Sequence, residues 1–395
     1  MRSRIIIANA QAVLPDELLD NCHIYIERGI IKDIKTDCAG IHDDAEVIDA
    51  AGRFVLPGLI DLHSDAIEKE IEPRPNALFP VDLSFRELEK KLAGNGITTI
   101  FHSISFSEDE FGLRSVSMAE KVVGQIRKNA GNRSLIRNRI HLRFEITNIH
   151  AVDTVVSLIK NKMVDMLSFM DHTLGQGQFK FREDYERYLA DKYGLSREKI
   201  QKLIDTRMAM DRDIMQALTY LSTEALSCGI VLASHDDDSS QKVKVMKMLG
   251  ATISEFPVNM EAARTACEAG MRVCVGAPNV LRGGSLTGNL RALDAIKEKS
   301  AHILCSDYYP AALVHAIFKL VSEGVPLPEA VNMASLNPAR AVGLDGELGS
   351  IEVGKKADII VVDFSDNVPV VVSTIVEGHT VYKVDYRKEY SIHGR

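Results

Sequence analysis

The chain has 395 residues, of which 46% are apolar and 26% are charged. These values are typical of a folded protein with a large buried core, and they exclude a disordered or collagen-like chain. The net charge of -8 argues against a nucleic-acid scaffold, because general attraction to a phosphate backbone needs a positive surface. A small phosphorylated substrate is still compatible with this charge, since a single pocket can be basic in an acidic protein.

The six cysteines are scattered along the chain, and no two of them form a Cys-x-x-Cys pair. This spacing disfavours both a disulfide framework and a thiolate zinc site. The N-terminal apolar run is three isoleucines long, which is too short for a signal peptide, and no stretch is long enough to span a membrane. We therefore expect a protein of the reducing cytoplasm that contacts neither membrane nor nucleic acid.

Short apolar segments separated by turn residues lie at both ends of the chain. They fall at residues 5–7, 23–26, 30–34 and 46–48, and again at 357–363, 369–374 and 379–382. Each end alone is too short to bury a core, so we predict that residues 1–55 and 350–395 fold together as a small β-sandwich domain. Two independent β-modules that flank an enzyme are the alternative.

Between the two ends, apolar segments alternate with helical stretches, as in a parallel sheet with crossover helices. We count eight such segments, at residues 59–63, 98–103, 141–146, 166–171, 230–235, 252–256, 272–276 and 302–306. They predict an α/β fold, a (β/α)₈ barrel over residues 56–349. Residues 173–227 are too long for a simple crossover. We expect this charged helical insertion to form a lid or an oligomer surface, and the protein to be a homo-oligomer.

Side chains that can bind a metal follow several of these predicted strands. His63 and Asp65 stand two residues apart at the end of the first strand, so both point to the same face. Alone, such a pair is more often a cap or a salt link. The pattern recurs at the ends of other strands, at Glu145, His172, His235 and Asp307.

In a barrel, all of these strand ends face one cavity. Three imidazoles and three carboxylates in one cavity are costly to bury unless they bind something. The mixed nitrogen and oxygen donors predict one or two divalent ions, Zn²⁺, Mn²⁺ or Fe²⁺ rather than Ca²⁺. Coincidental polar residues in the core are the alternative.

Two sequence signatures resemble those of a known family. Residues 57–63 (PGLIDLH) resemble the opening signature of the amidohydrolase superfamily, and residues 337–340 (NPAR) with 349–358 (GSIEVGKKAD) resemble its closing signature. The resemblance covers essentially the whole chain. It implies a metal-dependent hydrolase barrel with a β-sandwich made from both termini.

The chain departs from the wider superfamily at two positions. The first strand carries His-x-Asp, at His63 and Asp65, where most relatives carry His-x-His. No lysine stands where a carbamylated bridging ligand is usual, and Glu145 on the predicted third strand is the best substitute. Both changes add negative charge around the metal, and they leave the number of ions open.

Further motifs resemble one branch of the superfamily, the triphosphate diphosphatases of the carbon–phosphorus lyase pathway. These motifs are residues 63–69 (HSDAIEK), 73–75 (PRP), 233–237 (ASHDD), 255–257 (EFP), 276–285 (GAPNVLRGGS) and 306–308 (SDY). The resemblance implies hydrolysis of alpha-D-ribose 1-methylphosphonate 5-triphosphate to the 5-phosphate and pyrophosphate, a step of phosphonate catabolism. Another amidohydrolase activity, either cyclic amide hydrolysis or purine-type deamination, is the alternative.

If the reaction is hydrolysis of a phosphoanhydride, roles follow for the candidate residues. The ions would activate a water molecule, and Asp307 would accept its proton, although Asp307 could instead be only a metal ligand. A triphosphate also needs cationic and backbone donors in the pocket, whereas a cyclic amide or a purine does not. The candidates for substrate binding are Lys69, Arg74, Arg143, Arg282, Gly283, Gly284 and Ser285. Residues 282–285 follow the seventh strand, where barrels often build a phosphate site.

Overall fold

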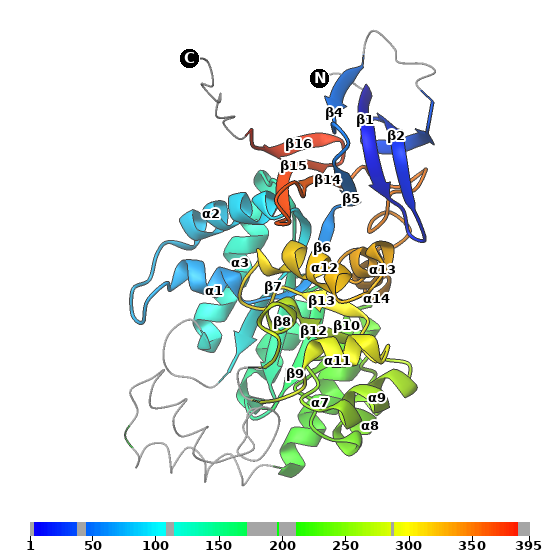
Figure 1. Cartoon of the computed structure of the whole chain (residues 1–395). Coiled ribbons are helices and arrows are strands. Elements are labelled where there is room, and N and C mark those ends of the chain that lie inside the picture. Colours follow the sequence, from blue (N-terminus) through cyan, green and yellow to red (C-terminus); the bar gives the residue numbers. More distant parts are fainter. Residues whose placement is uncertain are drawn as a thin grey trace.

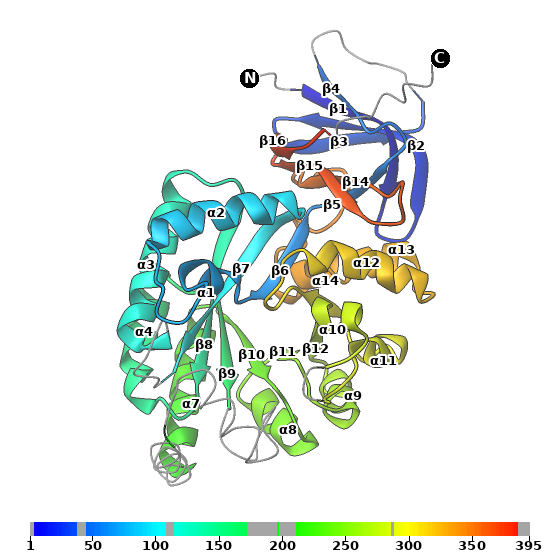
Figure 2. The same cartoon turned by 60° about the vertical axis from the view of Figure 1, so that its left-hand side comes forward.

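The computed structural model describes residues 4–37, 45–107, 114–171, 196, 211–285 and 288–385. Eight parallel strands, β6 to β13, pair in chain order (Figures 1 and 2). Their bounds are β6 Leu59–Ser64, β7 Ile97–Phe106, β8 Arg137–Glu145, β9 Met166–Met170, β10 Val231–His235, β11 Ile253–Glu255, β12 Arg272–Gly276 and β13 Ile303–Cys305. Each of the eight coincides with one predicted apolar segment.

The first and last of these strands meet and close the barrel. A parallel bridge joins Ser64 to Asp307. The Asp65 N–H donates to the Asp307 carbonyl at 2.7 Å, and the Asp307 N–H donates to the His63 carbonyl at 3.0 Å. The predicted (β/α)₈ barrel is therefore confirmed.

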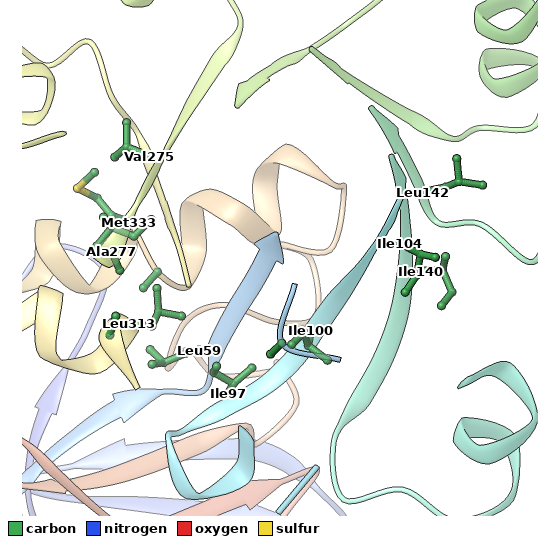
Figure 3. Close-up of a cluster of buried hydrophobic side chains, with 14 of the residues drawn as sticks. Leu59, Ile97, Ile100, Ile104, Ile140, Leu142, Val275, Ala277, Leu313 and Met333 are labelled. Carbon is green, nitrogen blue, oxygen red and sulfur yellow. The ribbon is translucent and has the colours of Figure 1, made fainter. Parts of the chain in front are cut away.

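The barrel strands are buried on both faces, with mainly apolar side chains toward the helices and a mixture of apolar and polar side chains in the interior. On β8, Ile140, Leu142 and Phe144 belong to the cluster between strands and helices, part of which is drawn in Figure 3. A separate cluster fills the barrel interior and includes Leu62 of β6 and Phe101 of β7. The alternation along β8 leaves Arg143 and Glu145 on the interior face.

Helices cover the outside of the barrel (Figures 1 and 2). Their bounds are α1 Ala66–Ile71, α2 Val81–Gly94, α3 Val116–Asn132, α4 Val152–Lys160, α7 Asp211–Ser227, α8 Ser240–Met248, α9 Met260–Glu268, α10 Ala277–Arg282, α11 Ala292–Lys297, α12 Ala312–Ser322, α13 Leu327–Asn332 and α14 Leu336–Ala341. The side chains of Ser239 and Asn259 accept a backbone N–H at the starts of α8 and α9, which fixes where these helices begin. Among the described residues, no helix is long and apolar enough to cross a membrane.

Of the predicted insertion at residues 173–227, the structure describes residue 196 and the helix α7. Ile214, Leu218, Leu221 and Ala225 of this helix are buried at helical spacing, so α7 packs its apolar stripe against the barrel like the other crossover helices. The rest of the insertion lies outside the described residues. Its role as a lid or an oligomer surface stays a prediction.

Strands from both ends of the chain form a second, mixed sheet in the order β16-β15-β14-β5-β1-β2-β3, with β4 paired to β1. Their bounds are β1 Arg4–Val13, β2 Leu18–Glu27, β3 Ile30–Lys35, β4 Glu46–Asp49, β5 Phe54–Pro57, β14 Ile359–Asp363, β15 Val370–Val376 and β16 His379–Lys383. The two ends meet where β14 pairs antiparallel with β5. The core of this sheet combines Ile7 and Ile24 with Ile359 and Ile375. The prediction that both ends fold together is confirmed, and the domain boundaries stay a prediction.

Candidate active site

A cavity of about 400 Å³ opens at the carboxyl ends of the barrel strands. This is the end of a barrel where functional residues gather, because the loops that follow the strands are free to vary there. Its lining includes His63, Asp65, Arg143, His235, Arg282 and Asp307. The strand-end residues that the structure places in this lining come from β6, β10 and the segment after β13, so the predicted convergence is observed for them.

His63 is buried at the end of β6 and is held by a carboxylate from across the barrel. Its Nδ1 donates to Oε1 of Glu255, the last residue of β11, at 3.1 Å. Its Nε2 lies 3.8 Å from Oδ1 of Asp65. Burial lowers the pKa of His63 to about 3, so the ring is neutral near pH 7. With Nδ1 protonated, the lone pair on Nε2 faces Asp65, as a metal-ligating histidine requires.

Two groups of side chains have ligand atoms close enough to share an ion, all within 4.8 Å of one another. One consists of His63, Asp65 and Asp307, and the other of His63, His235 and Glu255. Both groups combine imidazole nitrogens with carboxylate oxygens, and His63 belongs to both of them. The residues therefore fit a divalent metal with nitrogen and oxygen ligands.

Asp307 follows β13 at the junction that closes the barrel. Its φ of 56° is in the left-handed region, as are those of Asp236 after β10 and Phe256 after β11. Such backbone strain in three residues around one cavity is typical of functional sites. Burial raises the pKa of Asp307 to about 7, and the nearby negative charge of Asp65 adds to this shift. Its carboxyl group can therefore exchange a proton near neutral pH.

Arg143 reaches into the middle of the ligand cluster from β8. Its Nη1 donates to Oδ1 of Asp65 at 2.8 Å, and its Nη2 donates to Nε2 of His235 at 3.2 Å. Nδ1 of His235 lies 3.1 Å from Oδ2 of Asp236. The buried guanidinium group thus joins two of the predicted metal ligands.

Most of the residues predicted to bind substrate lie in the cavity lining or close to it. Arg282, Gly284 and Ser285 line the cavity, and Gly283 ends α10 with a φ of 79°, a left-handed cap that favours glycine. Lys69 lies at the mouth, where its Nζ is 4.5 Å from the ring centroid of the cavity-lining Tyr308.

The remaining predicted residues are not placed in the cavity. Arg74 is exposed and is not part of the cavity lining. Glu145 is buried at the end of β8, the third strand of the barrel, and belongs to neither of the two ligand groups. His172 lies outside the described residues.

Two further residues of the site, Glu255 and Arg114, were not among the site residues predicted from the sequence. Glu255 ends the sixth barrel strand, so the strand-end pattern that predicted the other candidate ligands could have predicted it too. Arg114 lines the cavity, and its Nε and Nη2 donate to Oε2 of Glu68 at 3.0 and 2.9 Å. No motif surrounds Arg114, so nothing in the sequence pointed to it.

Fold and site together define a hydrolase barrel with a metal-competent centre, and comparison with known proteins agrees. The chain matches the amidohydrolase family over residues 54–381 and belongs to that family of metal-dependent hydrolases. It is 32% identical over 376 residues to the alpha-D-ribose 1-methylphosphonate 5-triphosphate diphosphatase of Escherichia coli K12, covering 92% of this chain and 96% of that protein. The resemblance predicted from the motifs is therefore confirmed.

More distant relatives and structural neighbours carry the names of other enzymes. The imidazolonepropionase of Thermoplasma volcanium is 24% identical, with 89% of this chain and 86% of that protein covered. Among solved structures, the N-acetylglucosamine-6-phosphate deacetylase of Pasteurella multocida superposes with a TM-score of 0.65 at 14% identity, over 95% of this chain and 99% of that one. This structural likeness shows the fold alone.

Proposed function

We propose that this protein hydrolyses alpha-D-ribose 1-methylphosphonate 5-triphosphate to the 5-phosphate and pyrophosphate. The observation that carries the proposal is the presence of three arginines, Arg114, Arg143 and Arg282, in the lining of the same cavity as the candidate metal ligands. A triphosphate chain needs such donors, whereas a cyclic amide or a purine does not. The full-length similarity to the Escherichia coli diphosphatase supports the same substrate.

The proposed centre binds Zn²⁺, Mn²⁺ or Fe²⁺ through the described residues His63, Asp65 and Asp307, whose ligand atoms lie together. Glu145, His172 and His235 stay predicted ligands. When bound, a divalent ion would polarise a water molecule and offset charge on the phosphate oxygens. Glu255 keeps His63 in the tautomer that presents Nε2 to Asp65.

Asp307 is proposed to accept the proton of the attacking water. The water oxygen forms a bond to the phosphorus next to the ribose, the bond from that phosphorus to the bridging oxygen breaks, and pyrophosphate leaves with the electron pair. The Asp307 carboxylate lines the cavity and belongs to the group it forms with His63 and Asp65, where such a water would be held. Arg143, Arg114 and Arg282 would offset the charge on the three phosphoryl groups.

Phosphorus NMR of the metal-loaded protein with this triphosphate tests the proposal. Wild-type protein is expected to release pyrophosphate, and Asp307→Asn to release none. Asp294→Asn, at an exposed carboxylate on α11, is the matched control and should behave as wild type. Orthophosphate as the first product would place attack at the terminal phosphorus. No turnover with Zn²⁺, Mn²⁺ or Fe²⁺ would refute this substrate and favour a cyclic amide or a purine.

The compartment is proposed to be the cytoplasm. The five cysteines in the described part of the chain are free thiols, three of them buried. Free thiols are typical of proteins kept in a reducing environment. A homo-oligomeric state is part of the same proposal, and sedimentation of the purified protein would test it.

A further inference from the structure

We propose that the guanidinium group of Arg143 takes the place of a second metal ion, so that each chain holds one divalent ion. The inference rests on the proposed function, because it assumes that His63, Asp65 and Asp307 bind metal. It concerns a question that the sequence left open, namely whether the six predicted ligands serve one ion or two.

Arg143 already forms hydrogen bonds with two of the predicted metal ligands. The guanidinium bridges Asp65, directly after the first barrel strand, and His235 at the end of the fifth, at 2.8 and 3.2 Å. A hydrogen bond from Arg143 occupies the lone pair of His235 Nε2, which is the electron pair that a metal would need. Nδ1 of His235 then carries the proton and faces Asp236 at 3.1 Å. His235 can therefore bind an ion only if Arg143 moves away.

The positive charge of Arg143 also disfavours a second ion. Arginine stays protonated at any physiological pH, and the side chain of Arg143 is only 6% exposed. A second divalent ion between Asp65 and His235 would lie a few ångströms from this fixed positive charge. Repulsion between two cations is strong where water is excluded and screens them poorly. Arg143 therefore already supplies the positive charge that a second ion would bring.

One ion nevertheless fits beside the arginine. Asp65 uses Oδ1 for Arg143, and a carboxylate has further lone pairs for a metal. The group of His63, Asp65 and Asp307 leaves both the His63–Glu255 and the Arg143–His235 hydrogen bonds in place. An ion at His63, His235 and Glu255 would have to break both. Within the part of the chain that the structure describes, these contacts thus favour a single ion held by His63, Asp65 and Asp307, with Arg143 as its fixed neighbour.

This arrangement assigns Arg143 a part in the reaction. It lines the cavity, so a phosphoryl group bound beside the ion would meet the guanidinium as well. Two-metal phosphoryl-transfer sites use the second ion to stabilise charge that develops on phosphate oxygens. A guanidinium group can meet the same need with directed N–H donors.

Counting the bound metal tests the proposal without any substrate. The holoenzyme is loaded with excess Mn²⁺, freed of unbound metal by gel filtration, and assayed by mass spectrometry of the metal and by electron paramagnetic resonance. We expect one equivalent of Mn²⁺ per chain with the spectrum of an isolated ion. Two equivalents with an exchange-coupled spectrum would overturn the proposal, and no bound metal would overturn the metal-dependent function as well.

Variants test whether Arg143 is the cause. Arg143→Met frees Asp65 and His235 and should bind a second, coupled equivalent, whereas Arg143→Lys keeps the charge and should bind one. Arg282→Met, at another cavity arginine, is the matched control and should also bind one. A single equivalent in a folded Arg143→Met protein would refute the role of the arginine. If that variant does not fold, the number of Mn²⁺ ions bound by the wild-type chain decides between one and two ions. One bound ion without triphosphate turnover would refute the substrate and leave this inference standing.

Discussion

Nδ1 of His63 donates a hydrogen bond to Glu255 across the barrel mouth, joining the first strand to the sixth at 3.1 Å. Both side chains are buried. The glutamate therefore determines which nitrogen of the imidazole is left to bind metal. A residue that acts through a ligand in this way commonly changes metal affinity about 10- to 100-fold when it is removed.

We accordingly expect Glu255→Leu to weaken Mn²⁺ binding by roughly 10- to 100-fold. Glu255→Gln keeps an oxygen that accepts from Nδ1 and should lose much less. Metal titration by calorimetry measures both, and nitrogen NMR of labelled histidine reports which nitrogen of His63 carries the proton. Equal loss of affinity in the two variants would mean that the charge of Glu255, rather than its hydrogen bond, is what matters.

A buried carboxylate ties the strands that carry His235 and Glu255. Oδ2 of Asp237 accepts from Ser234 Oγ at 2.6 Å and from Ser254 Oγ at 2.5 Å. Replacing Asp237 by alanine leaves two buried hydroxyl groups without their acceptor.

We therefore expect Asp237→Ala to lower the free energy of unfolding by about 2–4 kcal/mol. Urea unfolding of the metal-free protein measures this change. Asp366→Ala in an exposed turn is the control and should shift the free energy by less than about 0.5 kcal/mol. A loss of that small size for Asp237→Ala as well would show that water replaces the carboxylate.

The protein is expected to be less stable in mild acid because of the buried, neutral His102. This residue is buried on β7, and its Nε2 bonds to Oδ1 of Asn138 at 2.8 Å. Burial lowers its pKa from 6.5 to about 4, so the unfolded chain binds the proton more tightly than the folded one. The stabilisation is complete above pH 6.5 and is lost as the pH falls toward 4.

Between pH 7.5 and pH 5, His102 should therefore cost about 2 kcal/mol of unfolding free energy. His102→Gln keeps a donor toward Asn138 and does not titrate in this range. Urea unfolding at the two pH values should show the difference between wild type and variant. The same pH dependence in both proteins would contradict the buried, neutral state of this histidine.

Arg282 is expected to contribute to substrate binding through a solvent-exposed contact with phosphate. It lines the cavity and is exposed, so Arg282→Gln should lower kcat/KM for the triphosphate roughly 10-fold, mainly through KM. The effect should shrink at high salt because screening weakens exposed charges. Steady-state kinetics at two ionic strengths measure it, with Arg272→Gln at the exposed start of β12 as control. An unchanged KM would remove Arg282 from the phosphate site.

The barrel was predictable because strands buried on both faces are rich in apolar residues, and several of them end at a polar side chain that lines the cavity. His63, Asp65, His235 and Asp307 followed from that pattern alone. The bridge that Arg143 makes to Asp65 and His235 could not be predicted, because it depends on how far apart non-adjacent strands lie in the closed barrel. The hydrogen bonds of Asp237 to Ser234 and Ser254 could not be predicted for the same reason, since these two serines precede two different strand ends.

The seam between β6 and β13 also affects the order of events during synthesis. His63 leaves the ribosome early, whereas Asp307, whose backbone bonds to His63 and Asp65, is among the last barrel residues to be made. Contacts between residues so far apart in sequence form slowly. A nascent or truncated chain that lacks residue 307 also lacks the backbone hydrogen bonds that close the barrel, together with one of the three side chains of a candidate metal group.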